Sequence, residues 1–508
     1  MPNRRRFLAT SAAISVASLA EVPWLGKLAP VGAAEADLNP QAVRLDPSME
    51  PLVSLIETTP RESLVEEIAQ RVRRGSLSYR DVLTGLFLAG VRNIQPRPSV
   101  GFKFHAVLVV NSAHLASLAS ADEDRWLPIF WALDQFKSSQ ARDAQEGNWT
   151  MGPVREDRLP SASGAEEAFV RAMESWDEEA ADVATAAIAR HLPAQRVFQL
   201  FARFASRDFR SIGHKAIYLA NSWRTLQCIG WHHAEPVLRS LAYALLNHEG
   251  EPNPAQNQLA PDQPWRENQP LADQWRGDWF EARSSSDGMT SEWIDALRTV
   301  SPNESCQRVT QMLNEGRPLQ SIWDGLFVAS SELLMRQPGI VALHAVTSTN
   351  ALAYIFQQVG DDRLRRLTLL QNAAFVPLFR EAMKGRGAVG DESVEKLQTA
   401  AREVSEAQGN VERVFDLVHS QPWQAAQLAL ATLRGGTTAE DLMRVARQLV
   451  FLKGDDSHDY KFSSAVLEDY YHVSPTWRNE FLSAATYHLR GRGEPTNPLV
   501  DRIRTALA

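Results

Sequence analysis

The chain has 508 residues and a formal net charge of −8, with 61 acidic against 53 basic residues. This balance argues against nucleic acid as a partner, because chains that bind nucleic acid usually carry an excess of Lys and Arg. The two cysteines, Cys228 and Cys306, could pair in an oxidising compartment but cannot form a disulfide framework, and no CxxC motif points to zinc or covalent haem.

The N-terminus has the pattern of a twin-arginine export signal. Consecutive arginines stand directly before Phe7 and Leu8, and an apolar run then leads to the small-residue end Ala34-Glu35-Ala36. The apolar run is too short for a membrane span, and its flanks suit cleavage. We therefore expect a signal peptide over residues 1–36, export by the twin-arginine machinery to the periplasm or the extracellular space, and no stable membrane anchor.

After an extended leader over residues 37–50, apolar residues recur at helical spacing and few segments alternate with period two. The pattern predicts an all-α fold of degenerate helical repeats in two halves, like an α-solenoid or a toroid. Two repeats fill the first half, 51–249, and two fill the second, 278–508. A polar stretch over 138–164 is expected to loop out, and the proline-rich segment 250–277 is expected to connect the halves at the surface.

Each of the four repeats contains a predicted apolar helix with a histidine at its start. These residues are His105, His214, His344 and His458. Independent support for the repeat comes from Gly-Leu-Phe, which occurs in 79–90, ahead of His105, and again in 321–334, ahead of His344. Imidazoles that persist while other residues drift indicate a site built from one side chain per repeat. We expect these catalytic histidines to line one pocket, with His214, His344 and His458 as metal ligands.

Helical geometry selects further residues for this pocket. Side chains three, four and seven positions after a residue share its face of a helix. This rule gives the predicted substrate-binding residues Tyr218, Asn221, Thr347 and Lys461. Lys103 and Lys215 also stand beside histidines and could bind an anionic or phenolic substrate or solvate helix ends; for Lys103 we favour solvation.

A structural role competes with these assignments. A histidine at the start of a helix is commonly a capping or buried structural residue. The acidic run around His458, from Asp455 to Asp459, could orient its ring or simply begin a helix. His114, nine residues after His105, falls on the opposite face and is expected to pack or to face solvent. The chain also has no dinucleotide fingerprint, P-loop, GxSxG elbow or HExxH motif, so hydrolases and nucleotide-dependent enzymes lose their main support.

Several segments resemble the questin oxidase-like proteins. They are the run over 457–485, which begins SHDYKFSSAVLED, the His-containing segments IVALHAVTSTNAL (340–352) and GHKAIYLANSW (213–223), and QWRGDWF (274–280). The similarity takes the form of scattered motifs over residues 98–508. The first repeat departs from the family's Asn-His-Gly-Pro, because this chain has Phe104-His105-Ala106-Val107.

The resemblance implies oxidoreductase chemistry. Proteins of this family are associated with oxidative opening of a polycyclic quinone ring, and a reduced nicotinamide has been linked to that activity. This sequence has no nicotinamide or flavin motif, so the cofactor stays open, and a His-bound redox metal, iron or copper, would reconcile oxidation with that absence. We therefore expect an exported oxidoreductase that acts on a small aromatic or quinone-like molecule. The alternative is a non-catalytic periplasmic helical scaffold or ligand-binding protein with structural histidines.

Overall fold

The computed structural model describes residues 41–96, 101–246, 252–254, 256–282, 288–404 and 410–508. The expected signal peptide, 1–36, lies outside these residues. Within them, all regular secondary structure is helical, as the apolar periodicity predicts. No helix in this part of the chain is both long and apolar enough to cross a membrane.

The helices up to the proline-rich segment are α3 (Glu50–Thr58), α4 (Arg61–Arg73), α5 (Tyr79–Asn93), α6 (His105–Leu108), α7 (Val110–Leu118), α8 (Leu127–Gln145), α9 (Ala165–Ser175), α10 (Glu178–His191), α11 (Ala194–Ala205), α12 (His214–Ile229) and α13 (Ala234–Leu245). Those that follow are α14 (Gln263–Asp273), α15 (Met289–Leu297), α16 (Pro302–Asn314), α17 (Leu319–Arg336), α18 (Ile340–Gln358), α19 (Asp362–Lys384), α20 (Val394–Arg402), α21 (Val411–Leu417), α22 (Pro422–Arg434), α23 (Ala439–Lys453), α24 (Ser457–Asp469), α25 (Arg478–Ala485) and α26 (Leu499–Leu507).

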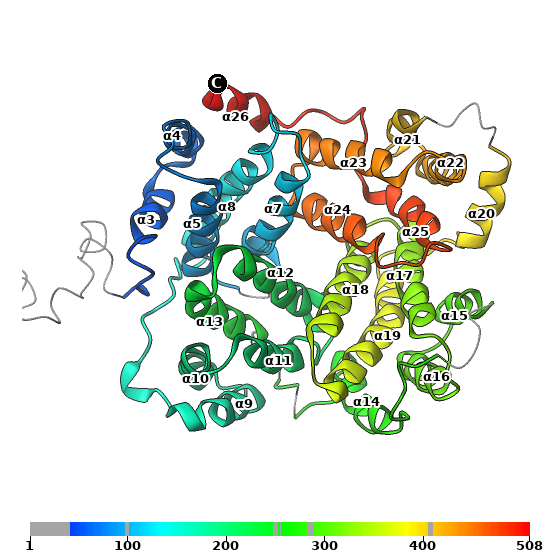
Figure 1. The fold of residues 1–508 in the computed structure, drawn as a ribbon, viewed down its shortest axis with the longest axis horizontal. Coiled ribbons are helices and arrows are strands. Elements are labelled where there is room, and N and C mark those ends of the chain that lie inside the picture. The colour runs from blue at the N-terminus through cyan, green and yellow to red at the C-terminus, as the bar shows by residue number, and fades with distance from the viewer. Residues whose placement is uncertain (1–40, 97–100, 247–251, 255, 283–287, 405–409) are drawn as a thin grey trace, which may run out of the picture.

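Four helices occupy the centre of the molecule (Figure 1). Helix α7 contacts α12, α12 contacts α18, α18 contacts α24, and α24 contacts α7, so the four form a closed ring. The remaining helices lie outside them, and the C-terminal α26 packs on α4 near the start of the described chain. The array therefore closes on itself, which makes the fold toroid-like. The two halves meet along the central helices, since α12 and α7 come from the first half and α18 and α24 from the second.

The repeated Gly-Leu-Phe motif marks equivalent packing in two repeats. Gly85 lies in α5 and Gly325 in α17. A Cβ at Gly85 would come within 3.0 Å of Leu52 in α3, and one at Gly325 would come within 3.0 Å of the Trp293 ring in α15. Each glycine therefore allows a close approach of a preceding helix, and this shared contact gives a physical reason for the motif.

Two predicted connections are more helical than expected. Helix α8 continues to Gln145, into the stretch 138–164, because Asp143 is buried there and forms an ion pair with Lys103. The proline-rich segment contains α14, which packs on α16 and α19, and Asn268 donates a buried hydrogen bond to Gln371. Pro264 does not break this helix, because a proline in the first turn lacks only an N–H that would have no helical partner.

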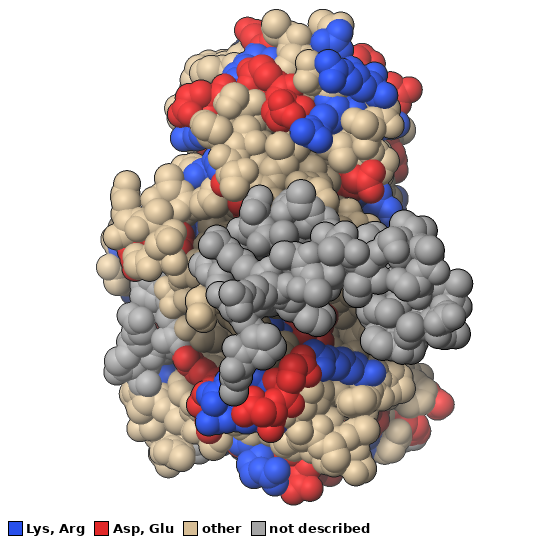
Figure 2. Space-filling model, turned by 90° about the vertical axis from the view of Figure 1, so that its left-hand side faces the viewer, with Lys and Arg blue, Asp and Glu red and all other residues tan. Residues whose placement is uncertain are grey.

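The charges on the surface are mixed, and the two cysteines are unpaired. Basic and acidic side chains are intermixed over the described part of the face in Figure 2. Both cysteines are free thiols: Cys228 is exposed on α12, and Cys306 is buried in α16. The pairing that the sequence left open is therefore not made.

Candidate metal centre

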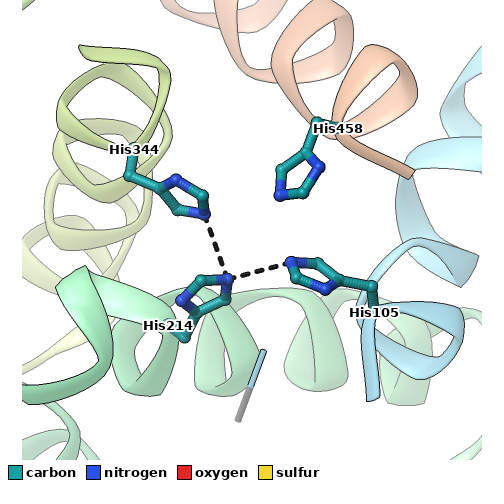
Figure 3. A group of neighbouring side chains, drawn as sticks. All are labelled: His105, His214, His344 and His458. Carbon is teal, nitrogen blue, oxygen red and sulfur yellow. Dashed lines mark hydrogen bonds between the residues drawn. The ribbon is translucent and has the colours of Figure 1, made fainter. Parts of the chain in front are cut away.

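The four histidines converge at the middle of the helical ring (Figure 3). The Nε2 atom of His214 lies 3.0 Å from that of His105 and 3.0 Å from that of His344. With His458, all four rings offer a nitrogen within 4.8 Å of every other. The expected clustering of His214, His344 and His458 is confirmed, and His105 completes the group despite its departure from the family pattern.

The other nitrogen of each ring has an acceptor of its own. Nδ1 of His105 donates to the carbonyl of Phe102 at 2.8 Å, that of His214 to Ser211 at 2.6 Å, and that of His344 to Ile340 at 2.6 Å. Because a carbonyl oxygen only accepts, each of these Nδ1 atoms carries the proton. The Nε2 atoms of the neutral rings therefore present lone pairs to one another.

Strained backbone turns orient the rings of His105 and His214. Phe102 and Ser211, whose carbonyls accept from His105 and His214, both have positive φ angles, 53° and 55°. Ile212 and Gly213 continue the left-handed turn with φ angles of 45° and 80°. Positive φ angles are uncommon for residues other than glycine and cost about 1–3 kcal/mol each when the residue is bulky. The same device thus precedes the histidine in two repeats, where it orients the imidazole.

His344 differs, because it lies in the second turn of α18 and not at its start. The prediction of a His-led helix was wrong at this position. The apolar residues of 340–343 form the first turn, and Gly339 at φ 150° precedes them. His344 can therefore use the carbonyl four residues back, Ile340, within a continuous helix.

A carboxylate orients the fourth ring. Asp456 caps α24 and forms a capping box with Asp459. Its Oδ1 accepts from both the backbone N–H of His458, at 2.7 Å, and Nδ1 of the ring, at 2.5 Å. Both readings of the acidic run are therefore correct, since it begins the helix and also fixes the imidazole. The Nε2 atom of His458 has no hydrogen-bond partner among the described residues.

The electrostatics of the centre keep the rings neutral. Burial is the largest cause that lowers the pKa of His105, His214 and His344 well below 6.5, and positive charge on Lys461 adds to it. Burial also lowers the pKa of His458, although its hydrogen bond to Asp456 opposes the shift. Neutral imidazoles whose lone pairs face each other at 3.0 Å repel, and a shared cation would remove that repulsion.

The donor set fits a first-row metal ion. Nitrogens bound to one ion at about 2.0–2.1 Å lie roughly 3–4 Å apart, and the two shortest separations here are 3.0 Å. Hydrogen bonds from the outer ring nitrogen to carbonyls or a carboxylate are the usual support of metal-binding histidines. Imidazole ligands suit iron, copper and zinc, and not magnesium or calcium, which take oxygen.

A small void begins one helical turn from the histidines, none of which lines it, and three of the four predicted substrate-binding residues do line it. They are Asn221, Thr347 and Lys461, and the void has a volume of about 10 Å³, room for about one water molecule. Lys461 is 3% exposed, its Nζ has no hydrogen-bond partner among the described residues, and burial lowers its pKa to about 7.

The fourth predicted residue, Tyr218, belongs to the core. Its side chain is fully buried, its ring packs edge-on against Phe104, and its hydroxyl donates to Ser240 at 2.8 Å. It is not among the described residues that line the void. The expectation that it faces the pocket was therefore wrong: four residues after His214, its side chain has already turned towards α13.

A larger cavity, of about 580 Å³, opens beyond the void. The ion pair between Arg224 and Glu468, 2.7 Å long, lines both spaces, and Asn350 donates to the same carboxylate at 3.0 Å. Ser112 and Ser464 also line both, and their hydroxyls are joined by a hydrogen bond of 2.8 Å. Arg224, Glu468 and both serines were not predicted from the sequence.

The remaining candidates fall outside the centre. Lys103 pairs with Asp143 at 2.8 Å, and Lys215 pairs with Asp208 at 2.9 Å, so both are buried structural cations and neither solvates a helix end. His114 is buried at the large cavity, where its ring contacts the hydroxyl of Tyr79 and the thiol of Cys228.

Comparisons of the chain with protein-family models, with curated proteins and with solved structures gave no match.

Proposed function

We propose that the protein is an exported oxidoreductase of the questin oxidase-like type, in which His105, His214, His344 and His458 bind a redox-active iron or copper ion. The main support for this proposal is that the four rings converge with their Nε2 lone pairs facing one another. Each Nδ1–H already donates to a backbone carbonyl or to Asp456, so it is the Nε2 atoms that are free to bind an ion. The resemblance of the His-containing segments to the questin oxidase-like proteins supports the oxidative reading, and the N-terminal arginines support export.

The protein's own groups have separable tasks in this proposal. The imidazoles hold the ion, and Asp456 and the three carbonyls keep each ring in one tautomer. The surrounding helices restrict water, since His214 is 4% and His344 1% exposed. Burial lowers the pKa of Lys461 to about 7, and a bound cation would lower it further, so its amine would be a proton acceptor near the centre. A bound redox metal would accept electrons from a small organic substrate.

Elemental analysis of protein purified without an affinity tag tests the metal. We expect about one iron or copper per chain, and loss of that metal in His344→Ala. His191→Ala, an exposed histidine on α10, is the matched control and should keep it. Zinc at the site would exclude the redox role. A protein without any first-row metal, and with unchanged folding in His344→Ala, would instead be the helical scaffold with structural histidines.

Export is tested separately. Replacement of Arg4 and Arg5 by lysine removes the guanidinium pair of the signal, so the precursor should accumulate in the cytoplasm. Immunoblots of cytoplasmic and periplasmic fractions measure this. Normal export of the variant would refute the twin-arginine assignment without bearing on the metal centre.

A further inference from the structure

We propose that the large cavity is a binding site for a mainly apolar small molecule that carries one anionic group, and that Arg447 determines this specificity. This proposal goes beyond the proposed function, because binding in the cavity needs no ion at the four histidines. The cavity lies between α7, α12, α23 and α24, beside the void that begins one helical turn from the four histidines.

The size and walls of the cavity suit a small organic molecule. Its volume of about 580 Å³ lies within the usual range for such sites, about 300–1,000 Å³. Leu115, Val450 and Leu467 contribute apolar wall. Leu118 and Tyr471 also line the cavity and are 62% and 58% exposed, which is unusual for large apolar side chains and leaves apolar surface for a ligand to cover.

The charges that line the cavity are unbalanced. Glu468 neutralises Arg224, whose guanidinium also lies 4.1 Å from the ring centre of Tyr354. Arg447 forms no ion pair or hydrogen bond with the described residues, and the adjacent Tyr471 hydroxyl donates to Glu440 instead. Burial lowers the pKa of Arg447, which means that the site holds a partly desolvated cation without a counter-ion.

An anionic group on the ligand would supply that counter-ion. A guanidinium presents several N–H donors in one plane and binds carboxylate-like anions through paired hydrogen bonds. The unpaired charge therefore selects a monoanion over a neutral molecule of the same shape, because the neutral molecule would cover Arg447 without compensating its charge.

Tyr460 lines the same cavity, although its hydroxyl is buried. The Tyr460 hydroxyl is buried without a hydrogen-bond partner among the described residues, and its ring is fixed by stacking on Trp131 at 4.2 Å. Lys461, the next residue, lines the void. Arg447 lines the cavity but not the void, so a ligand held by its anionic group would occupy the cavity and not the void.

Two fluorescent probes test the charge selection. Anilinonaphthalene sulfonate is apolar and anionic, and phenylnaphthylamine is the same ring system without the sulfonate. In Arg447→Gln, the affinity for the sulfonate should fall about ten- to hundredfold, the usual effect of losing one hydrogen bond between charged groups, while that for the neutral amine should not fall. Arg444→Gln, an exposed position on the same helix, should change neither affinity.

Cys228 reports where the probes bind. Its exposed thiol lines the cavity, whereas Cys306 is buried, so iodoacetamide should label Cys228 and bound probe should slow that labelling. Equal loss of both probes in Arg447→Gln, no loss of the sulfonate, or unchanged labelling of Cys228 would each overturn the proposal. The titrations are run on metal-free and metal-loaded protein. Charge selection without metal binding would refute the metal centre alone, and metal binding without charge selection would refute this inference alone.

Discussion

The carboxylate of Asp456 offers the sharpest test of the centre, because its charge and its hydrogen bonds can be removed one at a time. In Asp456→Asn, the remaining Oδ1 can still accept from the ring and from the backbone of His458, so only the charge is lost. In Asp456→Ala, both hydrogen bonds are lost as well. Groups that support a metal-binding histidine typically contribute 10–100-fold to metal affinity.

We expect about tenfold weaker metal binding in Asp456→Asn and about a hundredfold in Asp456→Ala, which correspond to about 1.4 and 2.7 kcal/mol. Competition with a chromogenic chelator measures the affinity. Asp177 is the matched control, since it caps α10 at the surface through a hydrogen bond from Ala180. Loss of the cap costs about 1 kcal/mol of stability at either helix. Metal affinity that is unchanged at Asp456, or weakened equally at Asp177, would refute the support of His458 by this carboxylate.

Three further outcomes follow from the structure. Saturation with the metal at a thousand times its dissociation constant should raise the free energy of unfolding by about 4 kcal/mol, and denaturant curves with and without a chelator measure the difference. Gly213→Ala should destabilise the protein more than Gly75→Ala: both glycines have positive φ, but only at Gly213 would the new Cβ lie 2.7 Å from Ser348 Cβ, and equal losses would contradict this. Burial lowers the pKa of His233 to about 4, whereas an unfolded chain titrates near 6.5, so the unfolded state binds the proton first as the pH falls. The free energy of unfolding should therefore fall as the pH drops from 6.5 to 4, by at most about 3 kcal/mol, and solvent screening should reduce this loss to about half. Urea unfolding at about pH 7 and about pH 4.5 measures the loss, and His233→Gln should lack it.

Much of the centre could be predicted because the repeat places the same positions on the same face of each helix. The void is lined by residues that stand three positions after a histidine, namely Ile217, Thr347 and Lys461. It is also lined by the residues that stand seven positions after each histidine, namely Ser112, Asn221, Ala351 and Ala465. Tyr218 fails because it stands four residues after His214. At about 100° per residue, positions three and seven lie within 60° on one side of the histidine, and position four lies 40° to the other side.

Residues of the large cavity that were not predicted follow the same spacing, about one turn further along each helix. Ten residues after the four histidines stand Leu115, Arg224, Tyr354 and Glu468, and all of them line the large cavity. Extension of the helical face by one turn would have found them. The strained carbonyls of Phe102 and Ser211 could not be found this way, because only tertiary packing holds a bulky residue at positive φ.

This regular spacing separates two properties of the protein. Helices α12, α18 and α24 each supply a histidine to the centre near their start and a different side chain to the large cavity about three turns later. In the first repeat, α6 supplies the histidine and α7 supplies the cavity residue. In the proposed function, the histidines and their Nδ1 acceptors would determine which ion binds. The positions ten residues after the histidines, together with Arg447, would determine which molecule fits in the large cavity. Substitutions at the cavity positions can therefore alter ligand selection without removing any ligand of the ion, because no cavity-lining residue contributes a nitrogen to the four-histidine group.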